Sequence, residues 1–207
     1  MESLCTDYWR PLYSYLRRNH SQHEAEDLTQ EFFDKRVLTQ LIFRGVDRSR
    51  GTFRTWLLNS LRNFVLNEID RQRAQKRGGG QPHLPFDFES GEACYAREPA
   101  SDHAPEKIYD RAWARALIER ALAQLRADYE RDGKAALFNE LQCCLTGAVV
   151  YAEVALRLGK SEDAVKMDVN RLRKACGAIL RTEINRTVSS PAEFAEEWRY
   201  LRSMFVE

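Results

Sequence analysis

The chain has 207 residues, of which 43% are hydrophobic and 30% charged, enough for one large or two small domains with a real core. No apolar run approaches the roughly 20 residues of a membrane-spanning helix. No signal peptide is recognisable either, so we expect a cytoplasmic protein. The five cysteines form no Cys-x-x-Cys pair and the four histidines are sparse, which predicts reduced thiols and no metal site.

The net charge of +1 hides a strong segregation of charge along the chain. Residues 44–77 carry nine basic and three acidic side chains, a net +6, and residues 157–181 carry seven against three, a net +4. Residues 86–106 carry six acidic side chains and one basic, a net −5. Two basic blocks around an acidic spacer indicate two nucleic-acid contacts and one segment that avoids nucleic acid or mimics it.

The first part of the chain reads as helix. A helix is expected over about 4–18, where Pro11 either kinks it or marks its first turn. Ser21 and Glu24 form a capping-box pattern that opens the next helix, over about 22–38. That helix turns Ala25, Leu28 and Phe32 inward. Its opposite face carries a set of polar side chains: Asp27, Gln30, Glu31 and Asp34.

Residues 51–77 form a helix with two different stripes. The core-facing arc consists of apolar side chains: Leu57, Leu58, Leu61, Phe64, Val65 and Ile69. Trp56 lies off this arc, on a polar face with Ser60, Asn63 and Asn67, and the helix ends in Arg71, Arg73, Lys76 and Arg77. A large aromatic among amides suits a surface that stacks bases, and the basic end suits phosphates. The alternative is a basic amphipathic helix whose Trp is covered by a neighbouring element.

Residues 78–106 form the boundary between the two halves, because Gly and Pro are frequent there and no periodicity is present. The second half is expected to begin with helices over about 107–130 and 134–145. No clear alternating strand appears anywhere, so we predict an all-α fold of two small helical domains joined by an irregular linker. Ser190-Pro191 starts a C-terminal helix with Phe194, Trp198, Leu201 and Phe205 on one stripe. We expect this tail to pack onto the second domain, with a docking or regulatory role as the alternative.

Residues 150–176 have helix-turn-helix spacing. Ala155 is small where two helices would cross, Gly159 can take positive φ in the turn, and Ser161 can cap the second helix. Ala164, Val165, Val169 and Leu172 would be buried. The exposed face of the second helix, which has the shape to enter a major groove, consists of Glu162, Asp163, Lys166, Met167, Asn170, Arg173 and Lys174. An αα-hairpin within a helical bundle is the alternative.

The order of these pieces resembles that of bacterial RNA polymerase sigma factors of the extracytoplasmic-function (ECF) type, which keep only sigma regions 2 and 4. Residues 25–33, Ala-Glu-Asp-Leu-Thr-Gln-Glu-Phe-Phe, are similar to the family segment that grips the β′ clamp helices of core RNA polymerase. Phe53-Arg54-x-Trp56-Leu57 and the basic run through Arg77 are similar to the segment that melts and reads the −10 element. Residues 149–175 are similar to the fourth region, which reads the −35 element.

The resemblance implies a division into region 2 at 1–77, a linker at 78–106, region 4 at 107–186 and a tail at 187–207. It implies that the polymerase is bound by Asp27, Gln30, Glu31, Phe32 and Asp34. It implies a −10 interface of Phe53, Arg54, Trp56, Asn59, Arg62, Asn63, Asn67, Arg71, Arg73, Lys76 and Arg77. It implies a −35 interface of Lys160, Ser161, Glu162, Asp163, Lys166, Met167, Asn170, Arg173 and Lys174. In the linker, Asp87, Glu89 and Glu92 would imitate phosphates near nascent RNA.

The partners implied are core RNA polymerase, through its β′ and β subunits, promoter DNA, and an anti-sigma factor or another regulator. We expect no catalytic residue, cofactor, small-molecule substrate or membrane insertion. Two alternatives remain: a free-standing helix-turn-helix regulator that binds duplex DNA without polymerase, and a helical adaptor that binds polymerase or a sensor protein but no DNA.

Overall fold

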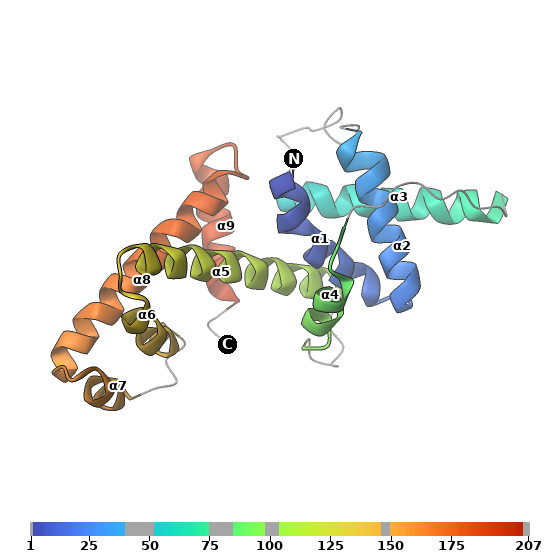
Figure 1. The fold of residues 1–207 in the computed structure, drawn as a ribbon. Coiled ribbons are helices and arrows are strands. Elements are labelled where there is room, and N and C mark those ends of the chain that lie inside the picture. The colour runs from blue at the N-terminus through green and yellow to red at the C-terminus, as the bar shows by residue number, and fades with distance from the viewer. Residues whose placement is uncertain (1, 40–51, 75–84, 98–103, 146–149, 205–207) are drawn as a thin grey trace. The chain divides into compact units, whose positions relative to one another are not determined.

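The computed structural model describes residues 2–39, 52–74, 85–97, 104–145 and 150–204. All regular structure in these ranges is helical and none is strand, as the sequence predicted (Figure 1). The chain divides into two compact units, the first formed by residues 1–116 with 187–207 and the second by residues 117–186. None of the helices in the described ranges is both long and apolar enough to cross a membrane.

The first unit is built around helices α1 (Glu2–Arg17), α2 (Gln22–Phe32) and α3 (Phe53–Ala74). α1 continues through Pro11. Figure 1 shows α1 and α2 joined by a short turn, with α3 crossing α2. The inward residues predicted for α2 and α3 are buried, namely Ala25, Leu28, Phe32, Leu57, Leu58, Leu61, Phe64 and Val65, and α1 adds Leu12 and Leu16 to this core. The side chain of Ile69 lies outside the described residues.

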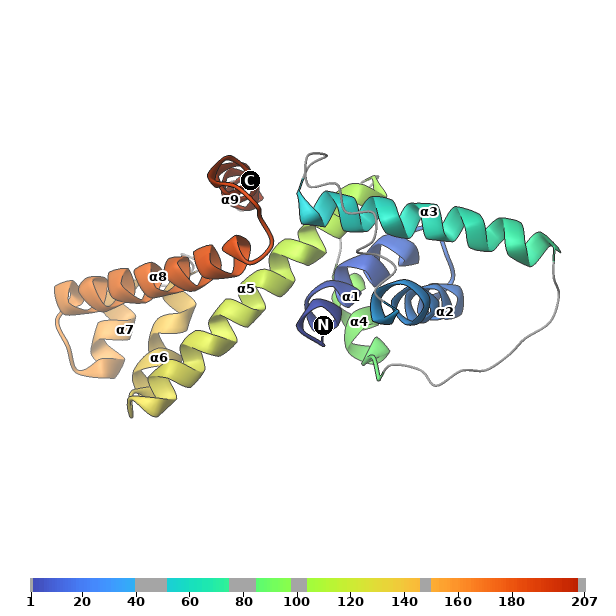
Figure 2. The same cartoon turned by 90° about the horizontal axis from the view of Figure 1, so that it is seen from above.

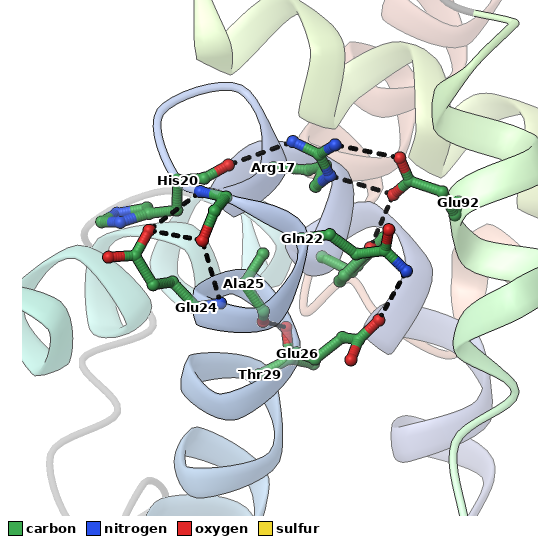
Figure 3. A network of polar contacts seen from close by, with 10 residues as sticks. Arg17, His20, Gln22, Glu24, Ala25, Glu26, Thr29 and Glu92 are labelled. Carbon is green, nitrogen blue, oxygen red and sulfur yellow. Dashed lines mark hydrogen bonds and ion pairs between the residues drawn. The ribbon is translucent and has the colours of Figure 1, made fainter.

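The start and the end of α2 are set by different local features. Ser21 caps the helix, and the reciprocal hydrogen bond from the Ser21 backbone N–H to Glu24 Oε2 is 2.9 Å long, so the predicted capping box is confirmed (Figure 3). Beyond Phe32 the chain widens into a π-helix, η1 (Phe33–Leu38), instead of continuing as α-helix to 38. This change of winding matters because it alters which side chains after Phe32 share a face with those before it.

The predicted linker contains a helix, α4 (Phe88–Tyr95), and is therefore not irregular throughout. Asp87 caps this helix by accepting a hydrogen bond from the Ser90 N–H. Phe86 stacks on Trp9 of α1, with ring centroids 5.3 Å apart, and Phe88 contacts the same ring edge-on at 5.7 Å. The sequence expectation failed here because Gly and Pro mark breaks but do not show which residues between the breaks pack against another helix.

The acidic side chain of Glu92 fastens α4 to α1. The Arg17 guanidinium donates to both carboxylate oxygens of Glu92, at 3.0 and 3.1 Å, and the Tyr13 hydroxyl donates to it at 2.7 Å (Figure 3). Burial and the neighbouring Glu92 carboxylate both raise the pKa of Tyr13. Asp87 and Glu92, which the sequence assigned to phosphate mimicry, are thus engaged in contacts within the first unit.

The first part of α5 and the C-terminal helix α9 complete the first unit. Helix α5 (Pro105–Arg131) contributes its residues up to Ala116 to the first unit and those from Leu117 to the second, so the second unit begins later than the expected residue 107. Helix α9 (Pro191–Ser203) begins with Ser190 as its cap and Pro191 in its first turn, as predicted. The structure groups this tail with the first unit, whereas we expected it on the second domain.

The second unit consists of the rest of α5 with α6 (Ala135–Leu141), the 3-10 turn η4 (Gln142–Leu145), α7 (Tyr151–Leu158) and α8 (Glu162–Asn185). Both views show α6 and α7 lying beside α8 (Figures 1 and 2). Their shared core contains Leu125, Phe138, Leu141, Cys144, Val154, Val165, Val169 and Leu172. Cys5 and Cys144 are buried, Cys94, Cys143 and Cys176 are partly buried, and none of the five forms a disulfide.

Candidate nucleic-acid and polymerase interfaces

The exposed side of α3 carries the amides that the sequence placed there. Asn59, Asn63 and Asn67 are all exposed, while Leu57 and Leu61 on the other side are fully buried. Trp56 is half-buried, and its ring lies 5.5 Å from that of Phe53, which in turn meets the edge of Tyr8 at 5.4 Å. The three rings thus form a chain from the core of the first unit to the surface of α3. This arrangement leaves part of Trp56 available beside the amides.

The basic residues predicted for the −10 interface have different environments. Arg62 is exposed and forms an ion pair with Glu106 at 2.6 Å. The side chains of Arg71 and Arg73, and the whole of Lys76 and Arg77, lie outside the described residues. An exposed ion pair is worth little, so Arg62 can exchange Glu106 for a phosphate at small cost.

Arg54 is not on this surface. Its guanidinium is buried and pairs with Asp110 of α5 and with Glu197 of α9, the latter at 3.0 Å. Burial alone would lower the pKa of Arg54, but the hydrogen bonds and charge of Glu197 and the charge of Asp110 raise it above the ordinary value. Because this guanidinium is buried and paired with two carboxylates, DNA cannot reach it, so we remove Arg54 from the expected DNA-contacting set.

The predicted polymerase-binding residues of α2 and η1 do not share one exposed face. Asp27 is exposed, whereas Phe32 is fully buried and Gln30 is 5% exposed. Glu31 is half-buried and bonds to Lys35 at 2.8 Å, and Asp34 is half-buried in η1. Phe32 therefore supports the fold beneath this surface, contrary to its expected contact with polymerase. The Gln30 Nε2 atom is buried without a hydrogen-bond partner among the described residues.

The helix-turn-helix prediction is confirmed in its local geometry. α7 ends at Gly159, which has φ 61° and ψ 32°, the left-handed conformation that glycine adopts without strain. Ser161 caps α8 by accepting a hydrogen bond from the Ala164 N–H at 3.3 Å. Ala155 is buried at the contact between α7 and α8, and Val165 packs in the same core. These features fix the angle at which α8 leaves the turn.

The outward face of α8 contains every residue that the sequence predicted there. The exposed set is Lys160, Ser161, Glu162, Asp163, Lys166, Met167, Asn170, Arg173 and Lys174. Lys166 pairs with Glu162 at 3.0 Å, and this hydrogen bond raises its pKa. Lys160 pairs with Asp168 at 2.6 Å, and Arg173 donates to the Cys144 carbonyl at 2.8 Å. Met167, at 57% exposure, adds an apolar contact point to the polar face.

Comparison with known proteins identifies a relative over most of the chain. The chain is 30% identical over 175 residues, 84% of its length, to the ECF RNA polymerase sigma factor SigE of Mycolicibacterium smegmatis. The chain resembles ECF sigma factors, as its motifs predicted. It spans 58% of the length of that relative. No family model matches the chain, and no solved structure matches it significantly.

Sequence reasoning missed the residues that hold Arg54. Asp110, Glu197 and Tyr200 are far from Arg54 in the chain and carry no local signal for a pair with it. One sign that Glu197 would be buried was available in the tail, because it lies next to Trp198 of the expected apolar stripe. The aromatic spacing of Phe86 and Phe88 was a second available sign, because two large apolar side chains in a polar linker favour burial.

Proposed function

We propose that the chain is an ECF-type sigma factor that binds core RNA polymerase, recognises −10 and −35 promoter elements and promotes melting of the DNA. The observation that carries this proposal is the stripe of exposed amides beside Trp56 on α3, combined in one chain with a helix-turn-helix. The similarity to SigE supports it. The proposed function requires neither a catalytic residue nor a cofactor from this chain, and it places the protein in the cytoplasm with the polymerase.

At the −10 element, Trp56 supplies a face on which an unpaired base can stack. Stacking of one base on an aromatic side chain is worth about 1–3 kcal/mol. Opening one base-pair step costs on the order of 1.4 kcal/mol. One stacked base therefore shifts the balance of local melting without dominating it. Asn59, Asn63 and Asn67 have amides that can form hydrogen bonds with base edges, and the positive charge of Arg62 can attract a phosphate of the DNA backbone.

At the −35 element, α8 enters the major groove of duplex DNA with its exposed face. Ser161 and the first turn of α8 present backbone N–H groups and a helix N-terminus toward a phosphate. Lys166 and Asn170 follow on the same face, and Met167 can contact a thymine methyl group. Lys166 pairs with Glu162 and Lys160 pairs with Asp168 at the surface, where DNA phosphates can take the place of the two carboxylates.

Core polymerase is contacted through the exposed and half-exposed acids of α2 and η1, namely Asp27, Glu31 and Asp34. Their acceptor oxygens suit a basic helical surface such as a clamp helix. Gln30 lies buried beneath this patch, and its amide nitrogen lacks a partner in the described residues. An anti-sigma factor or another regulator would compete for these surfaces.

Promoter selection tests the proposal. Core polymerase is incubated with random duplex fragments, with and without the purified chain, and complexes that resist a polyanion competitor are sequenced. A shared pair of motifs that appears only with core and chain together is the expected result. Enrichment by the chain alone would replace the proposal with the free-standing regulator, and binding to core without enrichment would replace it with the adaptor.

A further inference from the structure

The first turn of α3 is held by a buried ion cluster that spans three helices. Arg54 Nη2 lies 3.0 Å from Glu197 Oε1, and Arg54 Nε lies 3.2 Å from Glu197 Oε2, so the pair is bidentate. The third nitrogen of the guanidinium bonds to Asp110. The side chains of Arg54, Asp110 and Glu197 are only 11%, 14% and 4% exposed. The bidentate geometry fixes the orientation of the guanidinium relative to the carboxylate. Separating the two groups would leave a buried charge without a partner, so the pair holds α3 and α9 together.

Aromatic groups close the cluster and fix the backbone of Arg54 as well. The guanidinium carbon lies 4.5 Å from the centre of the Tyr200 ring and 4.8 Å from that of Trp113. The Tyr200 hydroxyl donates to Asp110, and the Tyr109 hydroxyl donates to the Arg54 carbonyl at 3.0 Å. Arg54 is therefore held at its carbonyl and at the end of its side chain.

The first turn of α3 is supported by Arg54 in addition to its own cap. The first turn of a helix has backbone N–H groups without intrahelical partners and tends to fray. The Thr52 side chain caps this turn by accepting a hydrogen bond from the Thr55 N–H at 3.4 Å. Phe53 and Trp56 both belong to this turn, with their rings 5.5 Å apart. Fixing Arg54 between them in sequence thus limits the positions that the two rings can take.

We propose that Glu197 and Arg54 are positioning residues of the −10 interface: the tail helix α9 grips Arg54 and thereby orients Trp56 for base stacking. This inference rests on the proposed function. It makes the C-terminal tail part of the structure that supports the −10 interface and gives the buried Glu197 a role in DNA opening. A preorganised stacking surface binds a base more tightly because the side chain loses less conformational entropy on binding.

The test measures binding of core polymerase with the full-length chain to a fluorescent single-stranded oligonucleotide that carries the −10 element found by promoter selection. Glu197→Gln keeps the size of the side chain and removes its charge. Glu196→Gln, at the exposed neighbouring position of α9, is the matched control. Each substitution is made in the wild-type chain and in the Trp56→Ala chain, and thermal unfolding of every variant is recorded. Tyr200→Phe, which removes only the hydrogen bond to Asp110, replaces Glu197→Gln if that variant does not fold.

Glu197→Gln is expected to weaken oligonucleotide binding about 5- to 10-fold, the loss of part of one stacking contact. Glu196→Gln should leave the affinity within about twofold of wild type. In the Trp56→Ala chain, Glu197→Gln should have no further effect, because the group that it positions is gone. An equal loss in both chains would overturn the inference and leave α9 a purely structural element, as would no loss in either.

Failure of the proposed function gives a different result. If Trp56→Ala alone binds the oligonucleotide as tightly as wild type, Trp56 makes no stacking contact, and the stacking role of α3 and the positioning role of Glu197 fall together. If Trp56→Ala weakens binding while Glu197→Gln does not, the proposed function stands and only the positioning role is lost.

Discussion

Replacing Gly91 by alanine tests whether the linker helix α4 is docked on α1. A Cβ atom at Gly91 would lie 2.9 and 3.1 Å from two atoms of the Trp9 ring and 3.3 Å from the Tyr13 ring. Both rings are buried, so neither can swing away freely. Overpacking of this kind costs about 1–3 kcal/mol. The gain in helix propensity from glycine to alanine returns up to about 1 kcal/mol. We therefore expect a net loss of about 1–2 kcal/mol.

Gly177 of α8 is the matched control, because a Cβ atom there would meet only the mobile end of Arg181 at 3.8 Å. Gly177→Ala should stabilise the second unit by up to about 1 kcal/mol. Scanning calorimetry of the full-length chain should show the transition of the first unit lowered by about 3–6 °C in Gly91→Ala. Shrinking the opposing ring with Trp9→Phe should relieve the cost of Gly91→Ala. A rise in melting temperature in Gly91→Ala like that in Gly177→Ala would refute the docking of α4.

Two further predictions concern the turn of the second unit and the tail. Gly159→Ala should destabilise the second unit by about 1 kcal/mol, since an L side chain is strained at φ 61°, and Gly159→Asn should cost less. Urea unfolding measures the stability of both variants. Equal stability of Gly159→Ala and wild type would contradict the turn geometry. Burial and the hydrogen bond to Asp110 raise the pKa of Tyr200 from 10.0 to about 12. The unfolded chain then releases this proton at lower pH than the folded chain, so the stabilisation is complete below pH 10 and is lost as the pH rises toward 12. The difference in unfolding free energy between wild type and Tyr200→Phe should shrink across that window, and a constant difference would count against the raised pKa.

The helix-turn-helix could be predicted from sequence because its determinants are local. Gly159, Ser161 and Ala155 each act through a few neighbouring residues, and each has the predicted geometry. The same holds for the capping box of α2. Patterns of this kind depend on backbone preferences and short hydrogen bonds, which a single stretch of sequence contains in full.

The environment of Arg54 and the packing of the linker could not be predicted in the same way. The contact of Arg54 with Glu197 joins residues that are 143 positions apart, and nothing near either residue identifies its partner. On α2, periodicity placed Gln30 on the exposed face, yet the structure buries it. Periodicity finds the most apolar stripe of a helix, but a helix packed against more than one neighbour buries a wider arc than that stripe.

Run-off transcription with purified core polymerase tests the central proposal most directly. The template is a promoter recovered by selection, and the wild-type chain is compared with Trp56→Ala and with Trp56→Phe, which keeps an aromatic face. The account predicts a core-dependent transcript that falls about 10-fold or more with Trp56→Ala and is largely kept with Trp56→Phe, in line with the loss of one stacked base. A transcript of equal strength from Trp56→Ala would contradict the role of α3 in melting. The absence of any core-dependent transcript, alongside tight binding of the chain alone to duplex DNA, would contradict the sigma-factor function itself.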